Sequence, residues 1–298
     1  MVVTDIMDPR IEPRSSDDLD RGTIYFKNVT RRVSLGGTRS LAALDDVSIT
    51  IPAGSRLALF ADGMETSRAF LSCLAGHDPI SSGTLLVGGC SSWVIGSRMP
   101  LMPSLSGRDN ADFLISVYGV YDDDTRELDF IEKLCDLGEL FDQPLEKYSS
   151  GMKDRFKLAL SLAFQFDVYP VMRFDGWNCR SEVPFMQQVK RLVDRRLEGR
   201  TLIAEASGSQ SFARDYCTTG IVFKDGQIIL QGTPDECATL AKEVRAARKD
   251  RSLSRSLRQH SDVEDSLEDT MNELLEASQP STGSNPGLEN SQDRNLPS

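Results

Sequence analysis

The chain has 298 residues, 39% of them hydrophobic, so it can bury one large core or two modest ones. Its net charge at pH 7 is -11, and much of it lies near the C-terminus, where nine carboxylates from Asp262 onward face Arg294 alone. The preceding part is only mildly acidic, which disfavours binding to nucleic-acid phosphates and predicts no nucleic-acid partner.

The cysteines and the apolar runs narrow the class of protein further. Six cysteines form no CxxC pair, so the sequence predicts neither a zinc site nor a disulfide framework, and a reducing cytosol fits best. No apolar run approaches the roughly 20 residues of a membrane helix, and we see no signal peptide. We therefore expect membrane contact only through a partner.

The first half of the chain begins with a flexible arm and continues with strands. Residues 1–21 are rich in Asp, Arg and Pro and form the arm. "TIYFKNVTRRV" alternates as a strand does, and "LDDVSITIPAGSRLALF" predicts two more strands around its Pro-Ala-Gly-Ser turn. A helix is expected from Ser67, with Phe70, Leu71 and Leu74 on one face and Gly76 at its end.

The second half alternates helices with buried strands. Residues 106–165 are expected to be mostly helical, "DVYPVMRF" and "RTLIAEA" to be buried strands with a helix between them, and "TTGIVFKDGQIILQGTP" to be a hairpin around Asp225-Gly226. This order predicts an α/β fold with a mostly parallel sheet. Residues 22–248 form the expected domain, and residues 249–298 form an acidic tail whose composition predicts disorder.

The middle of the chain carries a family resemblance. "SLSGRDNADFLISVYGVY" and "FIEKLCDLGELFDQPLEKYSSGMKDRFKLALSLAFQFDVY" closely resemble the ATP-binding subunit of ABC exporters of capsular polysaccharide, a branch of the polysaccharide and O-antigen exporter group. The resemblance runs from about Thr23 to Gly232. It implies a P-loop NTPase-like ABC nucleotide-binding domain with a mostly parallel sheet, an antiparallel β subdomain and a helical subdomain at about residues 100–165.

The family's signature motif is present as Tyr148-Ser149-Ser150-Gly151-Met152, followed by Lys153. A helix N-terminus offers free amides and a positive dipole end, which suit a γ-phosphate. In this family two ATPase domains pair head to tail, so the resemblance implies that the signature acts in trans on the partner's nucleotide. The alternative is that Ser149 is only the N-cap of a helix from Met152 to Phe164.

The family's P-loop, by contrast, is degenerate. In the pattern G-x-x-x-x-G-K-[ST], Ala61 replaces the first glycine, Thr66 the last, Ser67 the lysine and Arg68 the magnesium-binding hydroxyl. Only Gly63 remains to turn amides toward a phosphate. Asp62 and Glu65 add carboxylates where phosphate oxygens would lie, and such a contact near 4 Å costs about 4 kcal/mol at an effective dielectric of about 20. A side chain at position 68 points about 100° away from the lysine's direction.

The remaining nucleotide-binding positions are also changed. In the family register, Val33 stands where an aromatic residue stacks on adenine, and Met102 stands at the Q-loop glutamine. Met172 and Arg173 replace the magnesium-binding aspartate and the glutamate that activates water. The switch histidine falls at Ser207 or Gly208.

The residues that could substitute for these losses are poorly placed in the sequence. Asp175 follows the degenerate strand end closely, but there we expect a turn aspartate. The chain's two histidines, His77 and His260, lie just past the first helix and in the tail. We therefore predict no catalytic residue, no metal and no cofactor at the chain's own site.

Three functional hypotheses follow. In the first, the chain does not hydrolyse ATP itself but pairs with an intact ABC ATPase subunit, so that ATP and Mg bind only at a composite site. Its helical subdomain would contact a polysaccharide-export permease, which places it on the cytoplasmic face of the bacterial inner membrane. In the second, it is a stand-alone pseudo-ATPase scaffold or regulator, with Glu65 or Asp62 capping the first helix. In the third, it is a divergent active ATPase that depends on the region of Asp175.

Overall fold

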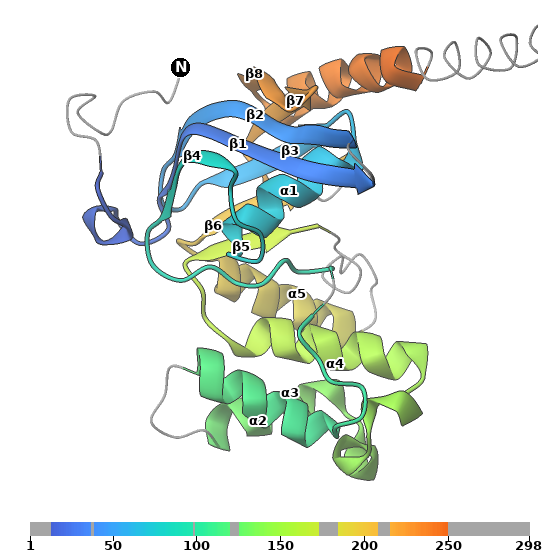
Figure 1. Ribbon diagram of the computed structural model, residues 1–298. Coiled ribbons are helices and arrows are strands. Elements are labelled where there is room, and N and C mark those ends of the chain that lie inside the picture. Colours follow the sequence, from blue (N-terminus) through green and yellow to red (C-terminus); the bar gives the residue numbers. More distant parts are fainter. Residues whose placement is uncertain are drawn as a thin grey trace, which may run out of the picture. The chain divides into compact units, whose positions relative to one another are not determined.

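The computed structural model describes residues 13–36, 39–97, 99–119, 125–172, 184–207 and 215–249. The strands form two sheets, and the helices pack on and beside them (Figure 1). The chain divides into two units after Ala246, two residues from the predicted boundary at residue 248. The second unit lies almost wholly outside the described residues.

An antiparallel sheet covers one side of the fold. It is built from β1 (Ile24–Gly36), β2 (Arg39–Ile51) and β4 (Ser82–Val87), in the order β2-β1-β4. The expected strand from Thr23 is confirmed, and the chain turns back into β2 as the Leu-Gly-Gly-Thr segment predicts. This sheet is the antiparallel subdomain that the resemblance implied.

A five-stranded mixed sheet forms the centre of the fold. Its strands are β3 (Arg56–Ala61), β5 (Val168–Val171), β6 (Thr201–Glu205), β7 (Thr219–Lys224) and β8 (Gln227–Gly232), in the order β5-β6-β3-β7-β8. The first four strands of that order run parallel, and only β8 is antiparallel to its neighbour. The predicted α/β fold, and the hairpin around Asp225-Gly226, are therefore confirmed.

The first helix, α1 (Met64–Leu74), lies between the two sheets (Figure 1). Its Phe70 is fully buried and stacks on Phe26 of β1, with ring centroids 4.8 Å apart. On the opposite side the same ring meets Phe223 of β7, with centroids 5.4 Å apart. Each of these rings contributes about 150–250 Å² of apolar contact, so this aromatic stack fixes α1 against both sheets.

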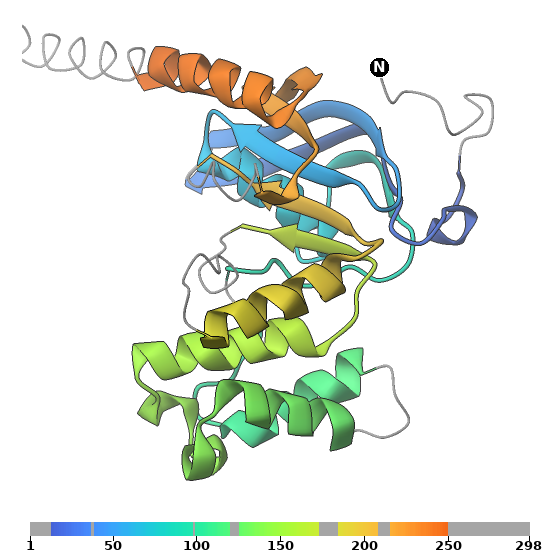
Figure 2. The same ribbon diagram turned by 180° about the vertical axis from the view of Figure 1, so that it is seen from behind.

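The helical region follows β4 in the chain and includes α2 (Gly107–Tyr118), α3 (Thr125–Cys135) and α4 (Ser150–Ala163). Two short 3-10 turns, Gly138–Asp142 and Leu145–Lys147, lead into α4. The helix α5 (Pro184–Leu197) lies between α4 and the mixed sheet in both views (Figure 2). Its Val189 and Val193 are fully buried in the core cluster that also takes in α2, α3 and α4. A last helix covers residues 234–249.

The N-terminal segment makes more tertiary contact than a flexible arm would. Residues 16–18 form a 3-10 turn, Leu19 is buried, and Arg21 forms an ion pair with Asp167, with 2.9 Å between Nη2 and Oδ2. The folded unit thus includes residues that composition assigned to the arm, because Arg21 balances a carboxylate that is only 2% exposed. Residues 1–12 lie outside the described part. Within the described segments, no helix combines the length and apolarity needed to cross a bilayer.

Candidate nucleotide site and signature turn

The carboxyl ends of β3, β5 and β6 meet at one edge of the mixed sheet. In open α/β sheets, ligands bind in the crevice outside this edge. The structure places three of the predicted positions here: Ala61 is the last residue of β3, Met172 directly follows β5, and Ser207 lies two residues after β6. These three predicted positions therefore lie at the carboxyl edge of the sheet.

The segment that should cradle phosphate is mostly helical. Helix α1 begins at Met64, three residues before the predicted start at Ser67, with Gly63 as its N-cap. Only Asp62 and Gly63 separate β3 from α1. A phosphate-binding loop needs several non-helical residues whose amides turn inward toward one group, and this connection has two.

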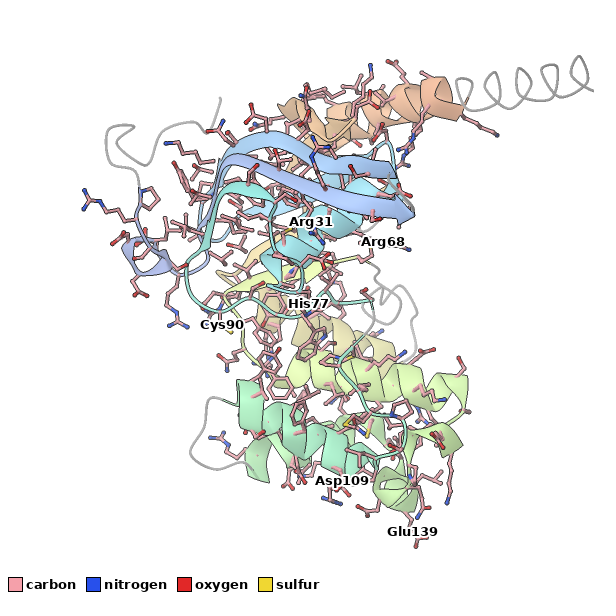
Figure 3. All side chains as sticks on the ribbon, viewed as in Figure 1. Arg31, Arg68, His77, Cys90, Asp109 and Glu139 are labelled. Atoms are coloured by element: carbon pink, nitrogen blue, oxygen red, sulfur yellow. The ribbon has the colours of Figure 1, made fainter. Side chains whose placement is uncertain are left out.

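Residues 66 to 68 direct no cation toward the sheet edge. Thr66 and Ser67 are buried, the latter only 1% exposed, so position 67 faces the protein interior. Arg68 lies on the exposed side of α1 (Figure 3). The one cation in this part of the helix therefore points away from the core, as expected from the 100° step between successive helical positions.

The two acidic residues of the segment differ in their surroundings. The amide of Asp62 donates to the carbonyl of Phe223 at 3.2 Å, and its Oδ2 accepts from the amide of Asp225 at 3.2 Å. Asp62 thus joins the end of β3 to the β7–β8 turn. Glu65 is exposed in the first turn of α1, where a carboxylate interacts favourably with the helix dipole.

Three apolar side chains stand at positions where the family carries polar or aromatic groups. Met172 is 7% exposed and belongs to the core cluster around α1, and its amide donates to the carbonyl of Ile95 at 2.8 Å. Val33 packs against the same cluster. Met102 is 57% exposed, and its backbone is held by Asn110, whose side chain accepts from the amide at 2.8 Å and donates to the carbonyl at 3.0 Å.

An arginine that belongs to no predicted motif contacts the backbone at the predicted switch position. Arg245, from the helix of residues 234–249, donates through Nε and Nη2 to the carbonyl of Ala61, each at 3.0 Å. Its Nη1 donates to the carbonyl of Ser207 at 2.9 Å. Burial lowers the pKa of Arg245, while Glu205 and Asp62 oppose that shift. The sequence carried no signal for this contact, because Ala61 and Arg245 are 184 positions apart.

Several predicted positions cannot be placed at this edge. Arg173, Asp175, Gly208 and His260 lie outside the described residues. His77 is exposed just beyond the C-terminal end of α1, whereas the degenerate loop precedes its N-terminal end (Figure 3). The helix is 11 residues, or about 16 Å at 1.5 Å per residue, so His77 does not reach the sheet edge.

The residues described at this edge do not suit a magnesium nucleotide. The connection after β3 is too short for a cradle, the lysine position is a buried serine, and the metal-ligand position is a buried thioether. Magnesium prefers oxygen ligands, and no cluster of three or more His, Cys, Asp or Glu suited to a metal occurs among the described residues. We therefore derive no chemical step at this edge.

The signature turn, residues 149–151, is exposed to solvent. Ser149 is the N-cap of α4, and its Oγ accepts from the amide of Met152 at 3.3 Å. The amide of Lys153 makes the first backbone bond of the helix, to the carbonyl of Ser149 at 3.0 Å, so the amides of Ser150 and Gly151 precede the helical ladder. The helix begins two residues before the predicted start at Met152.

The backbone of Gly151 is open to solvent. A Cβ built on this residue would meet no atom within 4 Å. Ser149 and Ser150 are exposed as well. The N-capping role of Ser149 is thus present in the structure, and the turn also offers its free amides to any group that approaches α4 along its axis.

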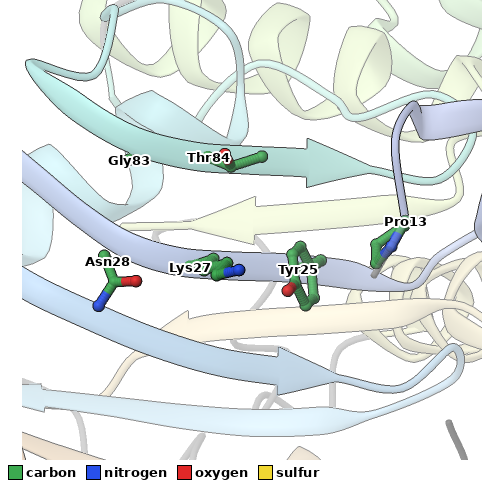
Figure 4. A pocket seen from close by; sticks show the side chains of 6 residues that line it. All are labelled: Pro13, Tyr25, Lys27, Asn28, Gly83 and Thr84. Atoms are coloured by element: carbon green, nitrogen blue, oxygen red, sulfur yellow. The ribbon is translucent and has the colours of Figure 1, made fainter. Parts of the chain in front are cut away.

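A shallow pocket of about 220 Å³ lies elsewhere, on the antiparallel sheet (Figure 4). It is lined by Pro13, Tyr25, Lys27, Asn28, Gly83 and Thr84. None of these residues belongs to the predicted nucleotide positions. Its lining includes the hydroxyls of Tyr25 and Thr84 but no carboxylate or histidine that could activate them, so this pocket has no arrangement that suggests catalysis.

Comparison with known proteins relates this site to a family. No protein-family model matches the chain. The polysialic acid transport ATP-binding protein KpsT of Escherichia coli is 30% identical over 184 residues, which cover 62% of this chain and 80% of KpsT. The capsule polysaccharide export ATP-binding protein CtrD of Neisseria meningitidis serogroup B is 27% identical, covering 69% of this chain and 92% of CtrD.

Solved structures support the fold. The ATP-binding cassette MJ0796, in a dimeric post-hydrolysis state bound to ADP and Pi, matches with a TM-score of 0.57 at 17% identity. The match covers 71% of this chain and 98% of that cassette. The sheets and helices described above are therefore those of an ATP-binding cassette. Together with the identity to KpsT, this shows that the chain belongs to the family of ATP-binding subunits of ABC exporters of capsular polysaccharide.

Proposed function

We propose that this chain is a degenerate ATP-binding subunit of a capsular polysaccharide exporter, which completes the nucleotide site of an intact partner instead of hydrolysing ATP itself. In this proposal the chain forms a heterodimer with an intact ABC ATPase subunit. ATP and Mg bind at one composite site, between the partner's P-loop and this chain's signature turn. The pair turns over ATP at that site alone.

The observation that supports this proposal is a contrast between the chain's own nucleotide site and its signature turn. The groups that would act on the chain's own nucleotide are replaced by a two-residue connection and a buried methionine. The turn that would act on a partner's nucleotide is exposed, with Ser149 as cap and the amides of Ser150 and Gly151 ahead of the helical ladder. A subunit that acts only on a partner's nucleotide needs the signature turn but not phosphate- and metal-binding groups of its own.

We propose further that the helical region contacts the permease of the exporter. The named relatives are transport and export ATP-binding proteins, and this region carries exposed apolar side chains that a partner could cover. They include Met102 at 57% exposure, and Phe113 and Val117 at 54% each, one turn apart on α2. Through that contact the chain is placed on the cytoplasmic face of the inner membrane.

The test is to mix the chain with an intact ATPase subunit of the same export system and to compare wild type with Gly151→Asp. A carboxylate at residue 151 repels an approaching γ-phosphate, so the ATPase rate of the mixture falls by about a hundredfold or more, as for a lost catalytic donor. Gly151 is outside the left-handed region and has free space for a side chain, so this variant folds and keeps its melting temperature.

Lys157→Gln is the matched control, because it lies exposed on α4 and changes the net charge by the same single unit. It leaves the rate of the mixture unchanged. Ser149→Ala is a poorer probe, since losing the N-cap costs about 1 kcal/mol of stability by itself. If Gly151→Asp leaves the ATPase rate of a stable mixture unaltered, the trans role is wrong and a scaffold without catalysis is favoured.

A further inference from the structure

Arg245 bridges the ends of two strands, although it lies far from both of them in the sequence. Its guanidinium donates to the carbonyl of Ala61 with two nitrogens and to the carbonyl of Ser207 with a third. The two carbonyls stand at the exits of β3 and β6, adjacent strands of the mixed sheet. One rigid, planar group therefore fixes the spacing of both exits.

Other bonds around the guanidinium reinforce this arrangement. The amide of Ala61 donates to Oγ of Ser207 at 3.4 Å, and the amide of Ser207 donates to Oε1 of Glu205 at 2.9 Å. Glu205 is 7% exposed, and the nearby carboxylates of Glu205 and Asp62 favour the charged form of Arg245. The charge-assisted bonds of this half-buried cation to the carbonyls, together with the nearby carboxylates, offset part of its desolvation.

We propose that Arg245 is an internal latch, which keeps the degenerate loop after β3 and the switch segment after β6 in one arrangement without any nucleotide. Separating Ala61 from Ser207 would break either the one hydrogen bond that Arg245 donates to Ser207 or the two that it donates to Ala61. The latch is independent of the proposed trans role, because it concerns only this chain's own strand ends.

The test is hydrogen–deuterium exchange of the full chain, read at the amides of Ala61, Asp62, Ala206 and Ser207. Arg245→Met keeps most of the aliphatic stem but removes all the donors, so these amides exchange at least about tenfold faster, while those of α4 and α5 keep their wild-type rates. Arg245→Lys retains the charge but lacks the fork, and its rates lie between the two.

Lys242→Met serves as the matched control, because Lys242 is exposed on the same helix. It leaves exchange at both strand exits unchanged. The latch is refuted if Arg245→Met exchanges like wild type at these four amides, or if it raises exchange equally throughout the sheet, since a general loss of stability would then account for the whole effect.

Discussion

Asp167 shows how much a single buried charge contributes to this fold. Its carboxylate is 2% exposed and accepts from Arg21 at 2.9 Å, from Arg200 at 2.6 Å and from the amide of Cys90 at 2.8 Å. Arg21 comes from the N-terminal segment and Arg200 from the turn before β6. The residue therefore links three segments that are distant in the sequence.

Replacing Asp167 by Ala is expected to lower the free energy of unfolding by about 3 kcal/mol, because it leaves Arg200 and the Cys90 amide without their acceptor. Urea denaturation measures this loss. Asp129→Ala is the control, since Asp129 forms an exposed pair with Lys133 and its loss costs at most about 0.5 kcal/mol. Equal effects of the two substitutions would show that burial of Asp167 contributes nothing.

The cysteines are expected to differ sharply in reactivity. Cys90 is exposed, whereas Cys73, Cys135, Cys217 and Cys237 are buried. Burial raises the pKa of Cys217 to about 12 and that of Cys73 to about 11, and desolvation raises the pKa of Cys90 too, so the exposure of the Cys90 thiol decides the difference. Iodoacetamide at pH 8 therefore labels Cys90 before the buried four, as peptide mapping can show. Faster labelling of Cys217 would contradict this.

Individual residues of the candidate nucleotide site show what could be predicted from the amino-acid sequence and what could not. The family register predicts that the lysine, the metal ligand and the Q-loop glutamine are replaced at Ser67, Met172 and Met102, and these replacements stay predictions. Arg245 was not predictable, because it belongs to no motif and reaches Ala61 across 184 positions. Long-range side-chain contacts of this kind depend on the completed fold.

At the scale of elements, hydrophobic periodicity and turn residues located most strands and helices. The Asp225-Gly226 turn was predicted correctly, because both residues adopt positive φ, which Asp tolerates and Gly favours. The start of α1 was predicted three residues late. That expectation followed the apolar spacing of Phe70, Leu71 and Leu74, which does not mark the first turn, where Met64 and Glu65 are exposed.

Two glycines with positive φ allow the energetic cost of backbone strain to be compared with the cost of a steric clash. Gly199 has φ +65 and free space around a Cβ, whereas a Cβ on Gly226, at φ +83, would lie 2.9 Å from the carbonyl of Ala42 in β2. Gly199→Ala is expected to cost about 1 kcal/mol in unfolding free energy. Gly226→Ala costs about 1–3 kcal/mol more, because β2 must shift. Equal losses in urea denaturation would refute this packing of the hairpin against β2.

At the scale of the whole molecule, stability is expected to fall at alkaline pH. Burial raises the pKa of Tyr148 from 10 to about 12 and that of Cys217 from 9 to about 12. Between pH 9 and pH 12 the unfolded chain therefore loses protons that the folded chain retains, so the free energy of unfolding declines as pH rises. Urea midpoints under reducing conditions at pH 8 and pH 10.5 measure the decline. An unchanged midpoint would contradict it.

The fold between Thr23 and Gly232 was predictable because the family resemblance and the strand-helix alternation agree over that range. The N-terminal boundary was less predictable. Composition assigned residues 13–21 to a flexible arm, but the contacts of Leu19 and Arg21 bring them into the folded unit. Composition reports average behaviour, and the burial of Leu19 together with the ion pair between Arg21 and the buried Asp167 is enough to override it.

The proposed function depends most on whether the chain's own site holds nucleotide. The decisive measurement is titration of the isolated chain with a fluorescent ATP analogue and magnesium, with melting temperatures recorded in parallel and KpsT as the reference protein. Binding at 100 times Kd stabilises a fold by about 2.7 kcal/mol, so occupancy is readily seen. We predict no saturable binding and no shift in melting temperature. Saturable, magnesium-dependent binding with a clear rise in melting temperature would contradict the proposed function.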